Sequence, residues 1–206
     1  MLTGTDTQTD RCLDAGCLDH VISLLQSGKP SLMKEAAWAA SNIFAGTHSQ
    51  IQRALEKDLL KPLLNVLANG EAKCQKEAAW AITNLCLGGT AEQLDVLVSS
   101  GFLEPYCQLL AAPDHRAVGL VLDGLDHLLQ AAVKYGQTDA LCLKLEEIGV
   151  LDQLEKLQEH ENEQVYKKTL HLLDTYFAEG DENAQPNQIE NEFQFNPNQG
   201  NPNINF

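Results

Sequence analysis

The sequence is poor in basic residues and contains no long apolar run. Only 14 of its 206 residues are Lys or Arg, against 29 Asp or Glu, so the formal net charge is −15. Because proteins bind nucleic acid by neutralising phosphates with basic side chains, this balance argues against nucleic acid and favours a basic partner. No apolar stretch approaches the roughly 18 residues that a membrane-spanning helix needs. The sequence therefore predicts neither a nucleic-acid nor a membrane partner.

Motifs for metal, phosphate or redox chemistry are missing as well. The six cysteines form no Cys-x-x-Cys pair, and with no signal peptide at the start they are interpreted as reduced thiols of a cytosolic or nuclear protein. No histidine stands at metal-ligand spacing from a cysteine, and no Gly-Lys-Ser/Thr follows the glycine pair at 88–89. Asp123 and His127 lie one helical turn apart, which is typical of a helix-surface pair. We expect no enzyme activity, no cofactor and no metal.

What the sequence does contain is a nine-residue segment that occurs almost twice. The segment at 34–42, KEAAWAASN, returns at 76–84 as KEAAWAITN, 42 positions later. A period near 42 with helical composition is typical of armadillo-type units of three helices, and it exceeds the 33–34 residues of tetratricopeptide or ankyrin units. The pattern predicts an all-α, armadillo-repeat, right-handed superhelical solenoid of about four three-helix repeats.

Apolar stripes and turn residues divide the chain into units of this length. Stripes with i, i+3, i+4, i+7 spacing predict the second helix of each unit at 18–25, 59–67, 102–110 and 150–157. The longer third helices are predicted at about 31–45, 71–87, 114–132 and 161–178. The solenoid would span 1–178, with repeats at approximately 5–46, 47–89, 90–136 and 137–178.

The two ends of the chain differ from these repeats. Residues 1–4 are interpreted as the end of a preceding repeat, because they resemble the turns that precede the next two repeats. No polar capping helix comes first, so we expect upstream repeats to be missing from this chain. Residues 179–206 hold eight Asn and no Lys or Arg, which predicts a disordered, acidic, Asn-rich tail.

The repeated residues lie on one face of each third helix, because they are spaced i, i+3 and i+7. They are Glu35, Trp38 and Asn42 in the first repeat and Glu77, Trp80 and Asn84 in the second. An Asn carboxamide offers a donor and an acceptor to the backbone of an extended peptide, a Trp ring stacks on a Lys or Arg stem, and a Glu favours a basic ligand. These residues predict an acidic, Trp/Asn-lined groove for a basic peptide.

The repetition also has a packing interpretation, in which Trp38 and Trp80 are ordinary core residues. The recurrence of Asn one turn after each Trp favours the groove, because a buried Asn without a partner is costly. The positions 42 residues beyond the second motif hold Leu122 and Asp126 instead. The groove is therefore predicted to end after the second repeat.

The chain closely resembles the C-terminal half of importin-α, the nuclear import adaptor family, over residues 2–178. The resemblance rests on the doubled motif, on LTGTD at 2–6, on GGTAEQ at 88–93 and on LQEHENE at 157–163. It implies armadillo repeats seven to ten of that family and shuttling between cytoplasm and nucleus. The first two repeats would then be part of the minor site for nuclear localisation signal peptides, to which the resemblance adds Ser41, the carbonyl of Leu2 and the hydroxyls of Thr3 and Thr9.

The resemblance also implies partners for the last repeats and departures from the family. An export receptor and a nucleoporin would bind there, at a surface that includes Glu159, His160, Glu161, Asn162 and Tyr166, although a solvated end helix explains this charged stretch equally well. The major peptide site, the sixth-repeat edge of the minor site and the importin-β-binding segment have no counterpart here. The alternative function is an armadillo scaffold that binds a partner protein through its end repeats, with no peptide in the groove.

Overall fold

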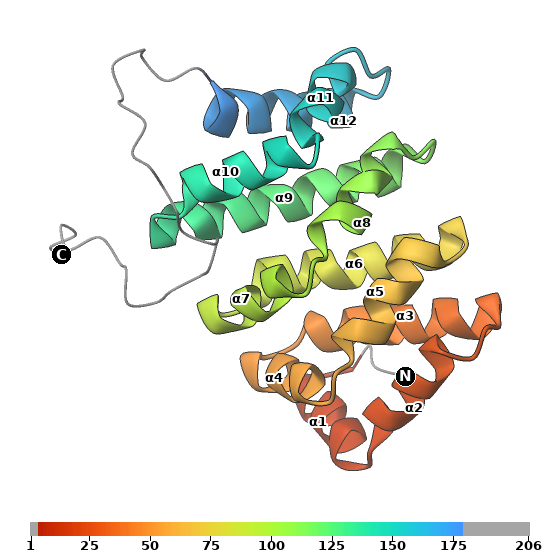
Figure 1. Cartoon of the computed structure of the whole chain (residues 1–206). Helices are drawn as coiled ribbons and strands as arrows, with labels where there is room; N and C mark the ends of the chain where they lie inside the picture. Colours follow the sequence, from red (N-terminus) through yellow and green to blue (C-terminus); the bar gives the residue numbers. More distant parts are fainter. Residues whose placement is uncertain (1–3, 179–206) are drawn as a thin grey trace, which may run out of the picture. The chain divides into compact units, whose positions relative to one another are not determined.

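The computed structural model describes residues 4–178, which fold into helices joined by short turns. The predicted tail at 179–206 and the predicted site residues Leu2 and Thr3 lie outside this range. Through the described residues run twelve α-helices, in four successive sets of a first, a second and a third helix (Figure 1). They confirm the prediction of an all-α fold with about four three-helix repeats.

The helices belong to two compact units, one ending at Tyr106 and the other beginning at Cys107. The first unit contains α1 (Asp6–Asp14), α2 (Cys17–Leu25), α3 (Pro30–Phe44), α4 (His48–Glu56), α5 (Leu60–Asn69), α6 (Ala72–Gly88), α7 (Ala91–Ser99) and most of α8 (Leu103–Cys107). The second contains the 3₁₀ turn η1 (Gln108–Ala111), α9 (His115–Tyr135), α10 (Thr138–Glu147), α11 (Val150–Leu157), α12 (Glu163–Leu172) and the π-helical turn η2 (Leu173–Phe177).

Two helices change their hydrogen-bonding type before they end. The helix predicted at 102–110 is α-helical as α8 and becomes 3₁₀ at Gln108, and the helix predicted at 161–178 becomes π-helical at Leu173. The last carbonyls of an α-helix have no N–H partner four residues later. A tighter 3₁₀ turn or a wider π turn gives some of them a different N–H partner. Apolar periodicity predicts where such a segment lies and does not distinguish these types.

A left-handed backbone residue separates the first and second helix in every set. These residues are Gly16, Asp58, Gly101 and Gly149, with φ of 81°, 58°, 74° and 76°. Glycine has no Cβ to clash in this conformation, and Asp is among the few other residues that tolerate it. They occupy the turns that precede the predicted second helices.

In the first unit, alanines let α3 and α6 pack side by side (Figure 1). Ala36, Ala37 and Ala40 on α3 are at most 2% exposed, and Ala78 and Ala79 on α6 are fully buried. Small side chains at a helix–helix contact allow the two backbones to approach closely. The faces of α3 and α6 that carry the repeated motif therefore lie next to each other.

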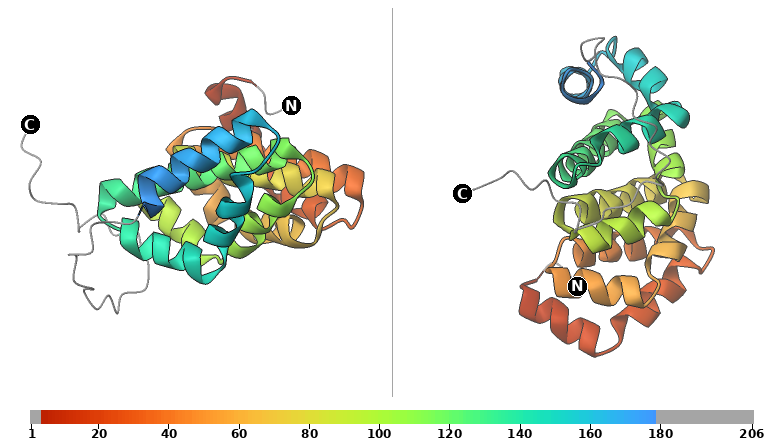
Figure 2. Two further views of the ribbon diagram at one scale, coloured as in Figure 1. Left: turned by 90° about the horizontal axis from the view of Figure 1, so that it is seen from above. Right: turned by 60° about the vertical axis from the view of Figure 1, so that its left-hand side comes forward.

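The second unit places α9 beside α12 in the same way (Figure 2). Val121, Leu125 and Leu128 on α9 and Val165 and Leu172 on α12 are at most 1% exposed. Larger aliphatic side chains thus fill the contact that alanines make in the first unit.

A buried glutamine joins the first helices of successive repeats. The Gln50 side chain accepts the Thr47 backbone N–H at 3.2 Å and donates to the Asp6 carbonyl at 3.0 Å and to Asp10 Oδ1 at 2.9 Å. It therefore caps α4 and attaches α4 to α1 with one carboxamide. Gln93 makes the corresponding bonds from α7 to α4. Side-chain to backbone bonds of this kind satisfy groups that would otherwise be buried without partners.

Replacing Gln50 tests this connection, with Gln8 as a matched control. Gln8 caps Thr5 in the same way but is exposed. We expect Gln50→Ala to lower the free energy of unfolding by about 2–3 kcal/mol, through lost hydrogen bonds and a cavity, and Gln8→Ala by less than about 1 kcal/mol. Chemical denaturation measures both. Equal losses in the two variants would contradict a bridging role for Gln50.

Burial also predicts which thiols are unreactive. It raises the pKa of Cys107 to about 12, and burial together with Asp139 and Glu146 raises that of Cys142 to about 11. At pH 8 both thiols stay protonated, so we expect alkylation by iodoacetamide about a hundredfold slower in the folded than in the unfolded protein. Mass spectrometry of labelled peptides measures the rates. Similar rates in both states would show that these thiols are accessible and ordinary.

Candidate functional site

The two tryptophans of the repeated motif are exposed. Trp38 on α3 is 39% exposed and Trp80 on α6 is 52% exposed. A large apolar ring normally contributes to the core, and these two indoles are instead exposed on neighbouring helices. The packing interpretation, in which both rings are core residues, is therefore wrong.

The asparagine that follows each indole is anchored through one N–H. Asn42 Nδ2 donates to the Trp38 carbonyl of its own helix at 3.0 Å. Asn84 Nδ2 crosses from α6 to the Ser41 carbonyl on α3 at 2.9 Å. A carboxamide has two N–H donors and an oxygen that accepts twice. Within residues 4–178, each Asn shows no partner for its second N–H or its oxygen, and both side chains are half-buried.

Two buried hydroxyls lie behind this face. Ser41 is 3% exposed and donates to the Trp38 carbonyl at 2.7 Å. Thr83, in the matching position of α6, donates to the Ala79 carbonyl at 3.0 Å and lies 2.7 Å from the Tyr106 hydroxyl. Ser41 was expected as a contact residue from the family resemblance. Its hydroxyl is bonded to the Trp38 carbonyl, and its contact with a peptide stays a prediction.

The other predicted residues of the site are spread more widely. Glu35 is exposed and pairs with the neighbouring Lys34 at 3.4 Å, while Glu77 is half-buried on α6. Thr9 is buried in α1, with 5% of its surface exposed. Helix α3 carries Glu35, Trp38 and Asn42, and α6, which packs against it, carries Glu77, Trp80 and Asn84. These six residues are called the α3–α6 face below.

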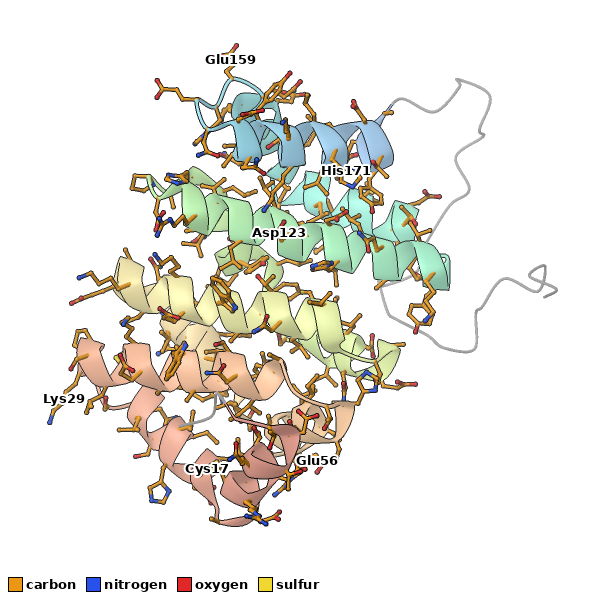
Figure 3. All side chains as sticks on the ribbon, turned by 180° about the vertical axis from the view of Figure 1, so that it is seen from behind. Cys17, Lys29, Glu56, Asp123, Glu159 and His171 are labelled. Carbon is orange, nitrogen blue, oxygen red and sulfur yellow. The ribbon has the colours of Figure 1, made fainter. Side chains whose placement is uncertain are left out.

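The second predicted set lies around the turn between α11 and α12. Glu159 (Figure 3) and Glu161 are exposed. Tyr166 on α12 is 40% exposed. Asn162 caps α12 by accepting the backbone N–H groups of two following residues, and its own N–H donates to His160 Nδ1 at 3.0 Å. Asn162 and His160 therefore have a structural role, and the exposed members are the ones available to a partner.

The described residues give little support for a metal site, an Asp–His pair or a membrane-spanning helix. Nowhere in 4–178 do three His, Cys, Asp or Glu side chains gather in a way that could hold a metal ion. Asp123 pairs with Lys168, 2.7 Å away, instead of with His127. None of the helices in that range is both long and apolar enough to cross a membrane.

Comparison with known proteins defines the class. The sequence model described as Armadillo/beta-catenin-like repeat matches residues 5–45 and 47–87, and that of the Atypical Arm repeat matches 139–191. A designed armadillo-repeat protein is 31% identical, with a TM-score of 0.71 over 84% of this chain and 70% of the other. Another, solved in complex with the peptide (KR)4, is 28% identical, with a TM-score of 0.59 over 85% and 88% of the two chains. The chain belongs to the armadillo-repeat family.

Its curated relatives specify the type of armadillo protein. Importin subunit alpha-1b of Oryza sativa subsp. japonica is 36% identical over 98% of this chain, and Importin subunit alpha-3 of Arabidopsis thaliana is 39% identical over 95%. These are armadillo repeats of the importin-α type, which confirms the resemblance inferred from the motifs. The chain spans 39% of the length of each of these two relatives.

Exposure of the two indoles has a direct spectroscopic consequence. In the single-tryptophan variants Trp38→Phe and Trp80→Phe, we expect the remaining indole to emit at long wavelength and to be quenched by acrylamide. Each change should alter the free energy of unfolding by less than about 1 kcal/mol, whereas Phe44→Ala in the core of the same unit should cost about 3–5 kcal/mol. Blue-shifted, unquenched emission would place the indoles inside the protein.

Proposed function

We propose that the α3–α6 face binds a short, extended peptide rich in Lys and Arg, as a nuclear localisation signal is. The observation that carries the proposal is the pair of exposed indoles, each followed one turn later by a partly free carboxamide. The indoles supply flat walls for aliphatic stems and attract a cation, with about 0.5–2 kcal/mol for each contact. The carboxamides hydrogen-bond the peptide backbone whatever its side chains.

The spacing of the helices fits such a ligand. Packed helices stand about 8–10 Å apart, and an extended chain advances about 3.3 Å per residue. Equivalent residues on α3 and α6 would therefore meet every third peptide residue or so. Glu35, Glu77 and the net charge of −15 favour a basic ligand and speed its arrival. The complex of a similar designed armadillo protein with (KR)4 supports this class of ligand.

At the level of the cell, the proposal is a nuclear import adaptor that shuttles between cytoplasm and nucleus, as the similarity to importin-α subunits suggests. The α3–α6 face would be part of its minor peptide site. Ser41, Leu2, Thr3 and Thr9 remain predicted members of that site. The exposed residues Glu159, Glu161 and Tyr166 are the part of the second set that we assign to an export receptor or nucleoporin.

A second candidate function is a scaffold that binds a partner through the second unit alone. It is favoured by a cavity of about 610 Å³ between α10, α11 and η2. Leu151, Leu173 and Phe177 supply apolar surface there, and Glu155 and Asp174 supply negative charge. Such a scaffold would have no use for the exposed indoles of α3 and α6, which is why the peptide proposal is preferred.

Binding of a labelled basic peptide separates the two functions. We expect weak binding to the wild-type chain that weakens further as salt is added, and about tenfold weaker binding to Trp38→Ala/Asn42→Ala. Fluorescence anisotropy measures the affinity. The matched control is Val96→Ala, a substitution of another exposed apolar residue, on α7. Equal binding by wild-type and double variant would refute the peptide proposal and leave the scaffold.

A further inference from the structure

The third helix of the third repeat, α9, carries Asp123 and Asp126 in the region that corresponds to the Trp/Asn motif of α6. These two residues are called the carboxylate face below. Counting 42 residues onward from Glu77, Trp80 and Asn84 leads to Gly119, Leu122 and Asp126. Leu122 is buried, so the exposed indole has no counterpart here. Asp123 and Asp126 instead provide negative charge beside the Gly119 backbone.

A lysine of the same unit occupies this carboxylate face. Lys168 on α12 places its Nζ 2.7 Å from Asp123 Oδ2 and 3.3 Å from the Gly119 carbonyl oxygen. A Cβ at Gly119 would lie 3.7 Å from this ammonium, an ordinary van der Waals distance, so the contact is made to the main-chain carbonyl and does not require a glycine. Figure 3 shows Asp123 on α9 below α12.

The neighbouring carboxylate is satisfied by three further groups of the second unit. Asp126 accepts the Tyr176 hydroxyl at 3.2 Å and Gln130 Nε2 at 2.8 Å, and it lies 3.3 Å from His171 Nε2. Burial, together with the Asp126 charge, raises the pKa of Tyr176 to about 12, so the phenol remains a donor at neutral pH. Asp126 therefore has little capacity left for a ligand, while Asp123 has one partner that could be exchanged.

We infer that Asp123 and the Gly119 carbonyl form a cation site for a primary alkylammonium group, such as a lysine side chain, and that Lys168 occupies it from within the chain. An ammonium has three N–H donors, and a carboxylate plus a main-chain carbonyl satisfy two of them. The Lys168 side chain is 36% exposed, so the third donor reaches water and the contact can exchange.

This occupancy makes Lys168 a specificity determinant. It keeps basic peptides off α9, which assumes the peptide-binding function proposed above for α3 and α6. Removing the Lys168 charge, for example by acetylation, would free Asp123 for an external lysine. The existence of the cation site itself does not depend on peptide binding by the first unit.

Chemical rescue of Lys168→Ala in the full chain tests the site. We expect this variant to melt at a lower temperature than wild type and to regain part of the loss with n-butylammonium at constant ionic strength. Wild type, Lys168→Ala/Asp123→Asn and the matched control Lys167→Ala should show no such rise. Lys167 lies on the same helix, where it pairs with the exposed Glu163 one turn earlier. An equal effect in all four proteins, or none in Lys168→Ala, would overturn the inference.

Two further measurements keep the inference separate from the peptide proposal and from misfolding. Rescue should persist in the Trp38→Ala/Asn42→Ala background, even if that background shows the peptide proposal to be wrong. If Lys168→Ala does not fold, acylation of the wild type gives the answer. Lys168 should react more slowly than Lys167, and Asp123→Asn should speed only Lys168, by roughly threefold to tenfold. Equal rates of the two lysines, unchanged by Asp123→Asn, would refute an occupied site.

Discussion

The close packing of α3 against α6 is the constraint on which the candidate site depends. Both helices carry buried alanines, and Asn84 on α6 reaches across to the Ser41 carbonyl on α3, 2.9 Å away. That bond orients the carboxamide before any ligand arrives. The indoles need no such bond, because their position on the helix already directs them away from the alanine contact. Preorganisation of this kind lowers the conformational entropy that the site itself would lose on binding a peptide.

The two units share one architecture but differ in whether the carboxylates on their third helices are neutralised by groups of the same unit. On the α3–α6 face, Glu35 has only its exposed neighbour Lys34 as an ion-pair partner in the described chain, and the indoles are uncovered. On α9, the carboxylates face Lys168, Tyr176 and His171 of the same unit. A half-exposed ion pair contributes little to stability. Its larger effect is to remove charge that an external lysine would otherwise find.

Much of the local structure could be predicted from the sequence, because it rests on interactions between residues close in the chain. Third helices predicted at 31–45 and 71–87 occur at 30–44 and 72–88, since apolar period and turn residues act within one or two turns. The change to 3₁₀ geometry at Gln108 and the division at Tyr106 were missed. Ser41 is predicted as a peptide-contact residue, and only the packing shows that it is 3% exposed.

What the sequence by itself determined is the repeat, the helices and the face on which Trp38 and Trp80 lie, because a 42-residue period and a 3.6-residue helix place equivalent side chains alike. Only the tertiary structure decided which groups from other helices bond to the side chains on those faces. Asn84 bonds to a residue 43 positions away and Lys168 to one 45 positions away. Such contacts depend on the distance between packed helices, which no local pattern encodes.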